Sequence, residues 1–145
     1  MSESSSIHPT AFGFAPYKSP GQLNPLVLAY IGDAVYEVFV RQYLISQPNH
    51  RPHELQKRST RYVSAKAQSA ALESWLPLLN EEEMTMIKRG RNAKSGSSPK
   101  NADIIDYRRS TGFECLIGYL YYTGQQERMI ELMQLALATL NETKR

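Results

Sequence analysis

The 145-residue chain has little cysteine and no long apolar run. Cys115 is its one cysteine, so an intrachain disulfide is impossible and a zinc site built from clustered cysteines is excluded. No stretch approaches the roughly 18 consecutive apolar residues that a membrane-spanning helix needs. The opening MSESSSIHPT also lacks the basic and then apolar layout of a signal peptide. These absences together predict a protein of the reducing cytoplasm that has no membrane segment.

The chain also lacks the alternation of apolar and polar residues that marks β-strands, and it shows no internal repeat. Helical signals are present instead. Asn24 followed by Pro25 is typical of an N-cap and a first helical residue, and apolar positions continue to Ile45 before Pro48. With 41% hydrophobic and 21% charged residues, the composition is that of a globular protein with one core. The sequence therefore predicts an all-α fold.

Five further helices are expected, over segments that begin at Pro52, Ser59 and Asn80 and over residues 102–124 and 125–140. Ser59 is the candidate N-cap of a long helix that ends before Pro77, and Gly90 is expected to end the helix that Asn80 caps. The first and fifth of the six helices should both contribute to the core.

Two segments are too rich in Ser, Gly and Pro to be helical. Residues 1–22 are expected to form a flexible N-terminal tail, and residues 91–101 are expected to form a loop. A single domain should therefore span residues 23–142.

Asp33 and Glu114 stand out because each is an acidic residue in a core helix with glycine nearby. Gly32 precedes Asp33, and Gly112 and Gly118 lie within about one turn of Glu114. Glycine costs about 1 kcal/mol relative to alanine in a helix interior, but it lets two backbones approach closely. The two carboxylates could then converge, and Mg²⁺ between them would relieve their repulsion. A solvated or capping role for each acid is the alternative that the residues alone leave open.

A basic region lies between the two acids. Residues 88–109 contain seven Lys or Arg and two Asp, a net charge of +5, whereas the whole chain carries +3. A second basic set, within residues 51–66, is opposed only by Glu54. Cations on a Gly/Ser-rich loop suit a nucleic-acid backbone, because phosphate contacts release counterions; two solvated faces are the alternative. The candidate binding residues are Lys88, Arg89, Arg91, Lys94, Lys100, Arg108, Arg109, Arg61 and Lys66.

Three motifs together resemble those of the ribonuclease III family. LAYIGDAVYE at residues 28–37 is similar to the family's signature helix, in which a Gly-Asp pair follows a short apolar run. STGFECLIGYLYYTG at 110–124 is similar to its second acidic helix. KRGRNAKSGSSPKN at 88–101 is very similar to the preceding loop of Mini-III, the branch that lacks a separate double-stranded-RNA-binding domain. The order and spacing of the motifs, over residues 23 to about 140, make the resemblance specific.

The resemblance implies a homodimeric all-α endoribonuclease that cuts double-stranded RNA with Mg²⁺ and leaves 5′-phosphate ends. It also implies maturation of 23S ribosomal RNA precursors, and it places Asp33 and Glu114 on the catalytic, metal-binding acids. Larger family members have three further acids, and Leu26, Ala29 and Thr111 stand at those positions here. We therefore expect one well-held Mg²⁺ per protomer, with any second ion held largely by water and RNA phosphate.

The missing acids also leave other functions open. One is a non-catalytic double-stranded-RNA-binding or ribosome-assembly protein on the same fold. Another is a helical interaction module whose basic face is incidental. A stimulating ribosomal protein is a further partner that the sequence leaves open.

Overall fold

The computed structural model describes residues 11–48, 50–94 and 103–142. Within these ranges there are six α-helices and no strand, which confirms the all-α prediction. The helices are α1 (Pro25–Ser46), α2 (Leu55–Val63), α3 (Ala65–Trp75), α4 (Glu81–Asn92), α5 (Ile104–Tyr122) and α6 (Gln126–Glu142). Short 3₁₀ turns cover Pro20–Gln22, Pro52–Glu54 and Leu76–Leu78. None of the helices in these ranges combines the length and the apolar character that a membrane crossing requires.

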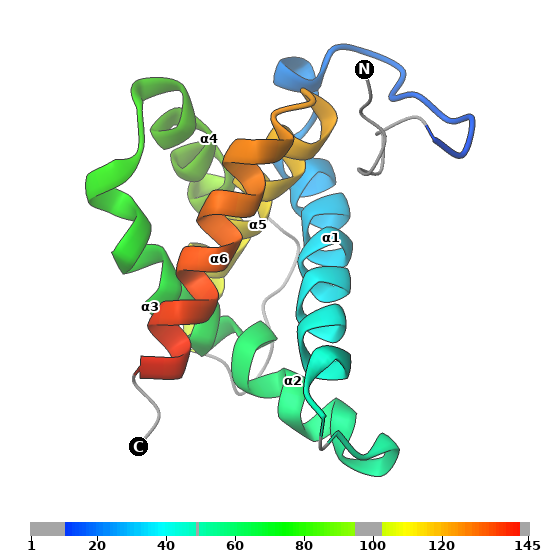
Figure 1. Ribbon diagram of the computed structural model, residues 1–145. Coiled ribbons are helices and arrows are strands. Elements are labelled where there is room, and N and C mark those ends of the chain that lie inside the picture. The colour runs from blue at the N-terminus through cyan, green and yellow to red at the C-terminus, as the bar shows by residue number, and fades with distance from the viewer. Residues whose placement is uncertain (1–10, 49, 95–102, 143–145) are drawn as a thin grey trace.

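Helix α5 is the central element of the bundle. It contacts α1, α3, α4 and α6, and in Figure 1 it passes behind α6 with α1 on one side and α4 on the other. The prediction that the first and fifth helices share the core is therefore confirmed.

Local capping chemistry explains where the helices begin. The Asn24 side chain accepts a hydrogen bond from a backbone N–H of the first turn of α1 at 2.8 Å. At α4, Asn80 and Glu83 form a reciprocal capping box. Asp103 accepts two backbone N–H bonds at the start of α5. Of the three predicted N-caps, Asn24 and Asn80 are confirmed.

The expected helix start at Ser59 is wrong. Ser59 lies inside α2, where its hydroxyl donates to the Gln56 carbonyl. The chain breaks instead at Ser64, whose extended backbone ends α2 and whose side chain caps α3 by accepting from the Ala67 N–H at 3.2 Å. Two helices therefore replace the single long one.

The expected helix end at Gly90 is also wrong, because α4 continues to Asn92. Gly90 serves helix packing instead. A Cβ at this position would lie 2.7 Å from the Cβ of Cys115 and 2.9 Å from the Thr111 carbonyl oxygen, so only glycine allows α4 to lie this close to α5.

The core is built around three aromatic side chains from different helices. Trp75 stacks on Phe113 with 4.3 Å between ring centroids, and Tyr36 meets Phe113 edge-on at 5.0 Å. The indole N–H of Trp75 donates to the Leu132 carbonyl at 2.8 Å, and the Tyr36 hydroxyl donates to the Tyr62 carbonyl at 3.1 Å. Apolar burial and satisfied polar atoms thus fix α1, α3, α5 and α6 together.

Helices α1 and α5 touch through their backbones. A Cβ on Gly32 would lie 1.9 Å from the Glu114 carbonyl oxygen, and a Cβ on Gly118 would lie 2.0 Å from the Leu28 carbonyl oxygen. Neither position has room for a side chain. Because Asp33 follows Gly32 directly, this crossing carries its carboxyl group to the helix that bears Glu114.

The segment before α1 is partly tied to the helices. Arg89 of α4 donates hydrogen bonds to the carbonyls of Gly21 and Leu23, each at 2.9 Å. Residues 1–10 of the expected N-terminal tail lie outside the described residues.

Replacing Gly32 with alanine should destabilise the protein. The new methyl group would meet the Glu114 carbonyl at 1.9 Å and the Gly118 backbone nitrogen at 2.8 Å, and neither backbone atom can rotate away. Overpacking of this kind should lower the free energy of unfolding by about 3 kcal/mol, measured by urea denaturation. Gly21→Ala is the matched control, because a Cβ at Gly21 meets nothing within 4 Å. An unchanged midpoint for Gly32→Ala would contradict the tight crossing.

Candidate active site

Asp33 of α1 and Glu114 of α5 line the same open cavity of about 420 Å³. Their carboxyl groups hydrogen-bond to each other. Asp33 is exposed, whereas Glu114 is half-buried. The junction of α2 and α3 forms another wall through Val63 and Ala65, and the first turns of α5 contribute Tyr107. The two acids singled out in the sequence are thus brought together at one solvent-accessible place.

The pKa of Glu114 is raised to about 8, chiefly by burial and then by the charge of the adjacent Asp33 and the hydrogen bond with it. The hydrogen bond from Gln68 acts in the opposite direction. At neutral pH Glu114 therefore holds a proton when no cation is near. A cation at the pair would favour the fully ionised form and displace that proton.

Gln68 of α3 completes the surroundings of Glu114. Its side-chain nitrogen donates to Glu114 Oε2 at 3.1 Å and to the Val63 carbonyl at 3.2 Å. Gln68 is not among the candidate site residues predicted from the sequence. The available signal was its position, because Gln68 shares the buried face of α3 with Leu72 and Trp75 at helical spacing. A polar residue on such a face needs partners inside the fold.

The oxygen-rich donor set suits a hard divalent cation such as Mg²⁺, which binds a few carboxylates and keeps several waters. The described residues contain no group of three or more His, Cys, Asp or Glu side chains that could hold a metal. Asp33 and Glu114 are the two carboxylates that line the cavity among the described residues. Leu26, Ala29 and Thr111, where larger ribonuclease III proteins have acids, line the same cavity. Water and substrate oxygens would have to supply the remaining coordination positions.

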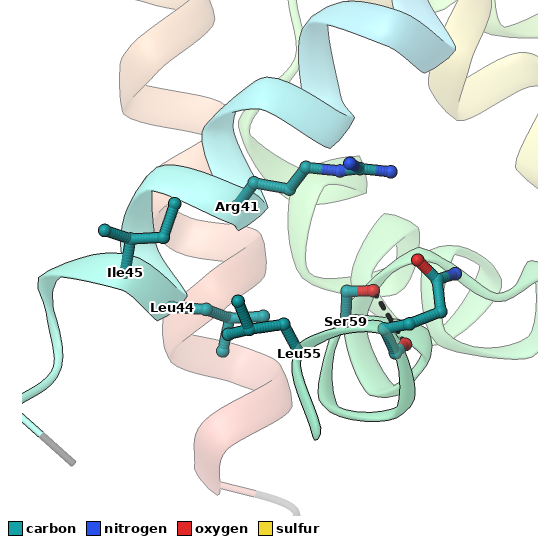
Figure 2. A pocket seen from close by; sticks show the side chains of 6 residues that line it. Arg41, Leu44, Ile45, Leu55 and Ser59 are labelled. Carbon is teal, nitrogen blue, oxygen red and sulfur yellow. Dashed lines mark hydrogen bonds between the residues drawn. The ribbon is translucent and has the colours of Figure 1, made fainter. Parts of the chain in front are cut away.

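A second, smaller cavity of about 140 Å³ lies between the end of α1 and the start of α2. Figure 2 shows the apolar side chains of Leu44, Ile45 and Leu55 there, with Arg41 above them. No carboxylate lines it, so it offers no cation site.

The predicted RNA-binding loop begins where α4 packs on α5, and the chain that follows it leads into the carboxylate cavity. At the end of α4, the Arg91 backbone nitrogen lies 3.5 Å from where a Cβ on Gly112 would be. The described chain resumes at Asp103, which caps the start of α5. Tyr107, one turn further along α5, lines the cavity. Lys88, Arg91, Lys94, Arg108 and Lys66 are exposed, and Lys100 lies outside the described residues.

Three of the candidate RNA-binding arginines have partners within the protein. Arg89 binds two carbonyls of the segment before α1. Arg109 forms an ion pair with Glu73 of α3. Arg61 lies over the ring of Tyr62, with 5.2 Å to the ring centroid. These contacts give all three side chains a role in the fold.

The amino-acid sequence is similar to those of ribonucleases. The family model described as Ribonuclease III domain matches residues 26–125. A Mini-ribonuclease 3 from Brevibacillus brevis is 56% identical over 121 residues, covering 83% of this chain and 90% of the relative. One from Enterococcus faecalis is 50% identical over 124 residues, covering 84% and 94%.

A crystal structure of a protein from Fusobacterium nucleatum has a similar fold. It aligns with a TM-score of 0.74 at 26% sequence identity, covering 83% of this chain and 98% of that one. The family match at residues 26–125 includes all of α5 and all but the first residue of α1, the two helices that carry the paired acids. The chain therefore belongs to the ribonuclease III family of endoribonucleases.

Proposed function

We propose that this endoribonuclease cuts double-stranded RNA in a Mg²⁺-dependent reaction, with Asp33 and Glu114 as its metal-binding, catalytic acids. The pair itself carries the proposal: two carboxyl groups, 81 residues apart along the chain, hydrogen-bond inside an open cavity. The relatives named Mini-ribonuclease 3 support the same reaction.

Each acid has a distinct place in the mechanism. Asp33 is exposed and meets the RNA backbone at the mouth of the cavity, whereas Glu114 is half-buried and held from α3 by Gln68. Asp33 and Glu114 would hold Mg²⁺, which when bound would supply a Lewis acid for the phosphodiester and lower the pKa of a water nucleophile. Hydrolysis by water leaves a 5′-phosphate and a 3′-hydroxyl, and the RNA 2′-hydroxyl is not needed as the nucleophile. One such ion per protomer matches the two carboxylates.

The basic residues predicted from the sequence would bind the RNA backbone. Lys88, Arg91, Lys94, Lys100, Arg108 and Lys66 are the main phosphate-binding candidates, with Arg89, Arg109 and Arg61 as secondary ones. The wide minor groove of A-form RNA shows 2′-hydroxyls and phosphates in a regular array, so the shape of the duplex is read more than its sequence. The proposed natural substrate is the 23S ribosomal RNA precursor in the cytoplasm.

An exposed apolar face on α1 supports a homodimer. Val27, Tyr30, Val38 and Ile45 lie on one side of this helix at helical spacing, and each is at least 40% exposed. Exposed apolar patches of this kind mark interaction surfaces. Two copies joined by a two-fold axis through this face would present two equivalent cavities, one for each strand of a duplex.

Asp33→Asn should reduce cleavage of a labelled RNA duplex by at least about 100-fold, because it removes a metal-binding charge worth several kcal/mol in the transition state. Amide and carboxylic acid have nearly the same shape, so the thermal melting curve should be unchanged. Glu127→Gln, at an exposed position of α6, is the matched control and should cleave normally. Wild-type activity in purified Asp33→Asn would rule out the metal-binding role.

Mg²⁺ binding should release protons below pH 8. The pKa of Glu114 is raised to about 8, so its protonated form dominates at lower pH and must lose the proton when the cation binds. Affinity should rise about tenfold per pH unit between pH 6 and 7 and level off above pH 8. Titration calorimetry at pH 7 in buffers of different ionisation enthalpy should detect close to one proton released. A pH-independent affinity would argue against the raised pKa of Glu114.

Lys94→Ala combined with Lys100→Ala should weaken duplex binding and flatten its dependence on salt. Each lost phosphate contact lowers the slope of log K against log salt by about 1. Lys57→Ala, an exposed lysine of α2 outside the candidate set, is the control. Fluorescence anisotropy at several salt concentrations gives both slopes, and equal slopes for the double variant and the control would exclude the loop.

A further inference from the structure

We propose that Gln68 is a positioning residue that holds the Glu114 carboxylate in its cation-binding orientation. The inference rests on the function proposed above and adds a residue to it. Asp33 reaches Glu114 from α1, and Gln68 reaches it from α3. Three helices thus meet at one carboxyl group.

The hydrogen bonds of Gln68 fix the orientation of its amide. The side-chain nitrogen lies 3.2 Å from the Val63 carbonyl oxygen and 3.1 Å from Glu114 Oε2. A backbone carbonyl can only accept, so the nitrogen must face Val63. The second hydrogen of the same nitrogen then points to Glu114. One carboxylate oxygen is therefore tethered to a rigid helix junction, as is common for ligands of protein-bound metals.

The burial of Gln68 also indicates a role beyond packing. Its side chain is only 1% exposed, and its Oε1 atom has no hydrogen-bond partner among the described residues. An unpaired buried acceptor costs stability. Its neighbours on the same face of α3, Ala71, Leu72 and Trp75, are apolar or mostly so. Packing alone would favour an apolar side chain of the same size at position 68.

A purely structural role is the competing explanation. The bond to Val63 satisfies one of the carbonyls that the end of α2 leaves without a helical partner. A residue that only caps α2 would affect thermal stability and leave cation binding unchanged. The two roles therefore differ in a measurable quantity.

Gln68→Met in the full chain separates them, because methionine has similar length and flexibility but donates no hydrogen bond. Leu72→Ala, one turn away on α3, is the control that destabilises the same helix by leaving a cavity. Calorimetric titration with MgCl₂ in the absence of RNA should show a dissociation constant raised about 10-fold or more in Gln68→Met. Leu72→Ala should lower the melting temperature at least as much while its dissociation constant stays within about twofold of wild type.

Cleavage gives a second measurement. The Mg²⁺ concentration for half-maximal cleavage should rise by the same factor in Gln68→Met, and saturating Mg²⁺ should restore most of the rate. Gln68→Leu replaces this variant if Gln68→Met does not fold. Wild-type Mg²⁺ affinity in the variant, or an equal loss in Leu72→Ala, would overturn the proposal. Failure of the wild-type protein itself to bind Mg²⁺ would instead remove the metal-binding role of Asp33 and Glu114, and the positioning role with it.

Discussion

The backbone contact between α1 and α5 is the constraint on which the rest of the structure depends. Gly32 and Gly118 leave no space for a side chain at the crossing, so the helices meet through main-chain atoms. Two glycines in helix interiors lower local helix stability by about 1 kcal/mol each. In return, Asp33 and Glu114 project from rigid helix interiors and not from loops, which limits how far either carboxyl group can move.

Two acidic side chains, Asp33 and Glu114, line the cavity among the described residues, and this small number limits its negative charge. Leu26, Ala29 and Thr111 line it at the positions where larger ribonuclease III proteins have acids. Additional carboxylates there would increase the repulsion that already raises the pKa of Glu114. A protonated Glu114 carries no charge, so its burial does not require a bound cation. The cavity also keeps more room for water and phosphate oxygens than a fully acidic cluster would.

Local signals in the sequence predict much of this fold, and long-range contacts account for what they miss. Asn24 and Asn80 were identified as caps because capping depends on a few adjacent residues. The convergence of Asp33 and Glu114 was predicted because glycine lies within about one helical turn of each acid. Gly90 was misassigned because its close packing on α5 is a tertiary contact. Gln68 was not found because its partner is 46 residues away. Helical periodicity also does not predict the contacts that Arg61, Arg89 and Arg109 make within the fold.

Tyr30 belongs both to the exposed apolar face of α1 and to the carboxylate cavity. Its ring is 82% exposed on the apolar face of α1, and the same residue lines the carboxylate cavity. In the proposed homodimer, each subunit would cover this face of its partner and would therefore lie next to the partner's carboxylate cavity. Specific activity would then fall on dilution, at the concentration where the subunits separate, so the amount of protein in the cell would itself regulate RNA cleavage.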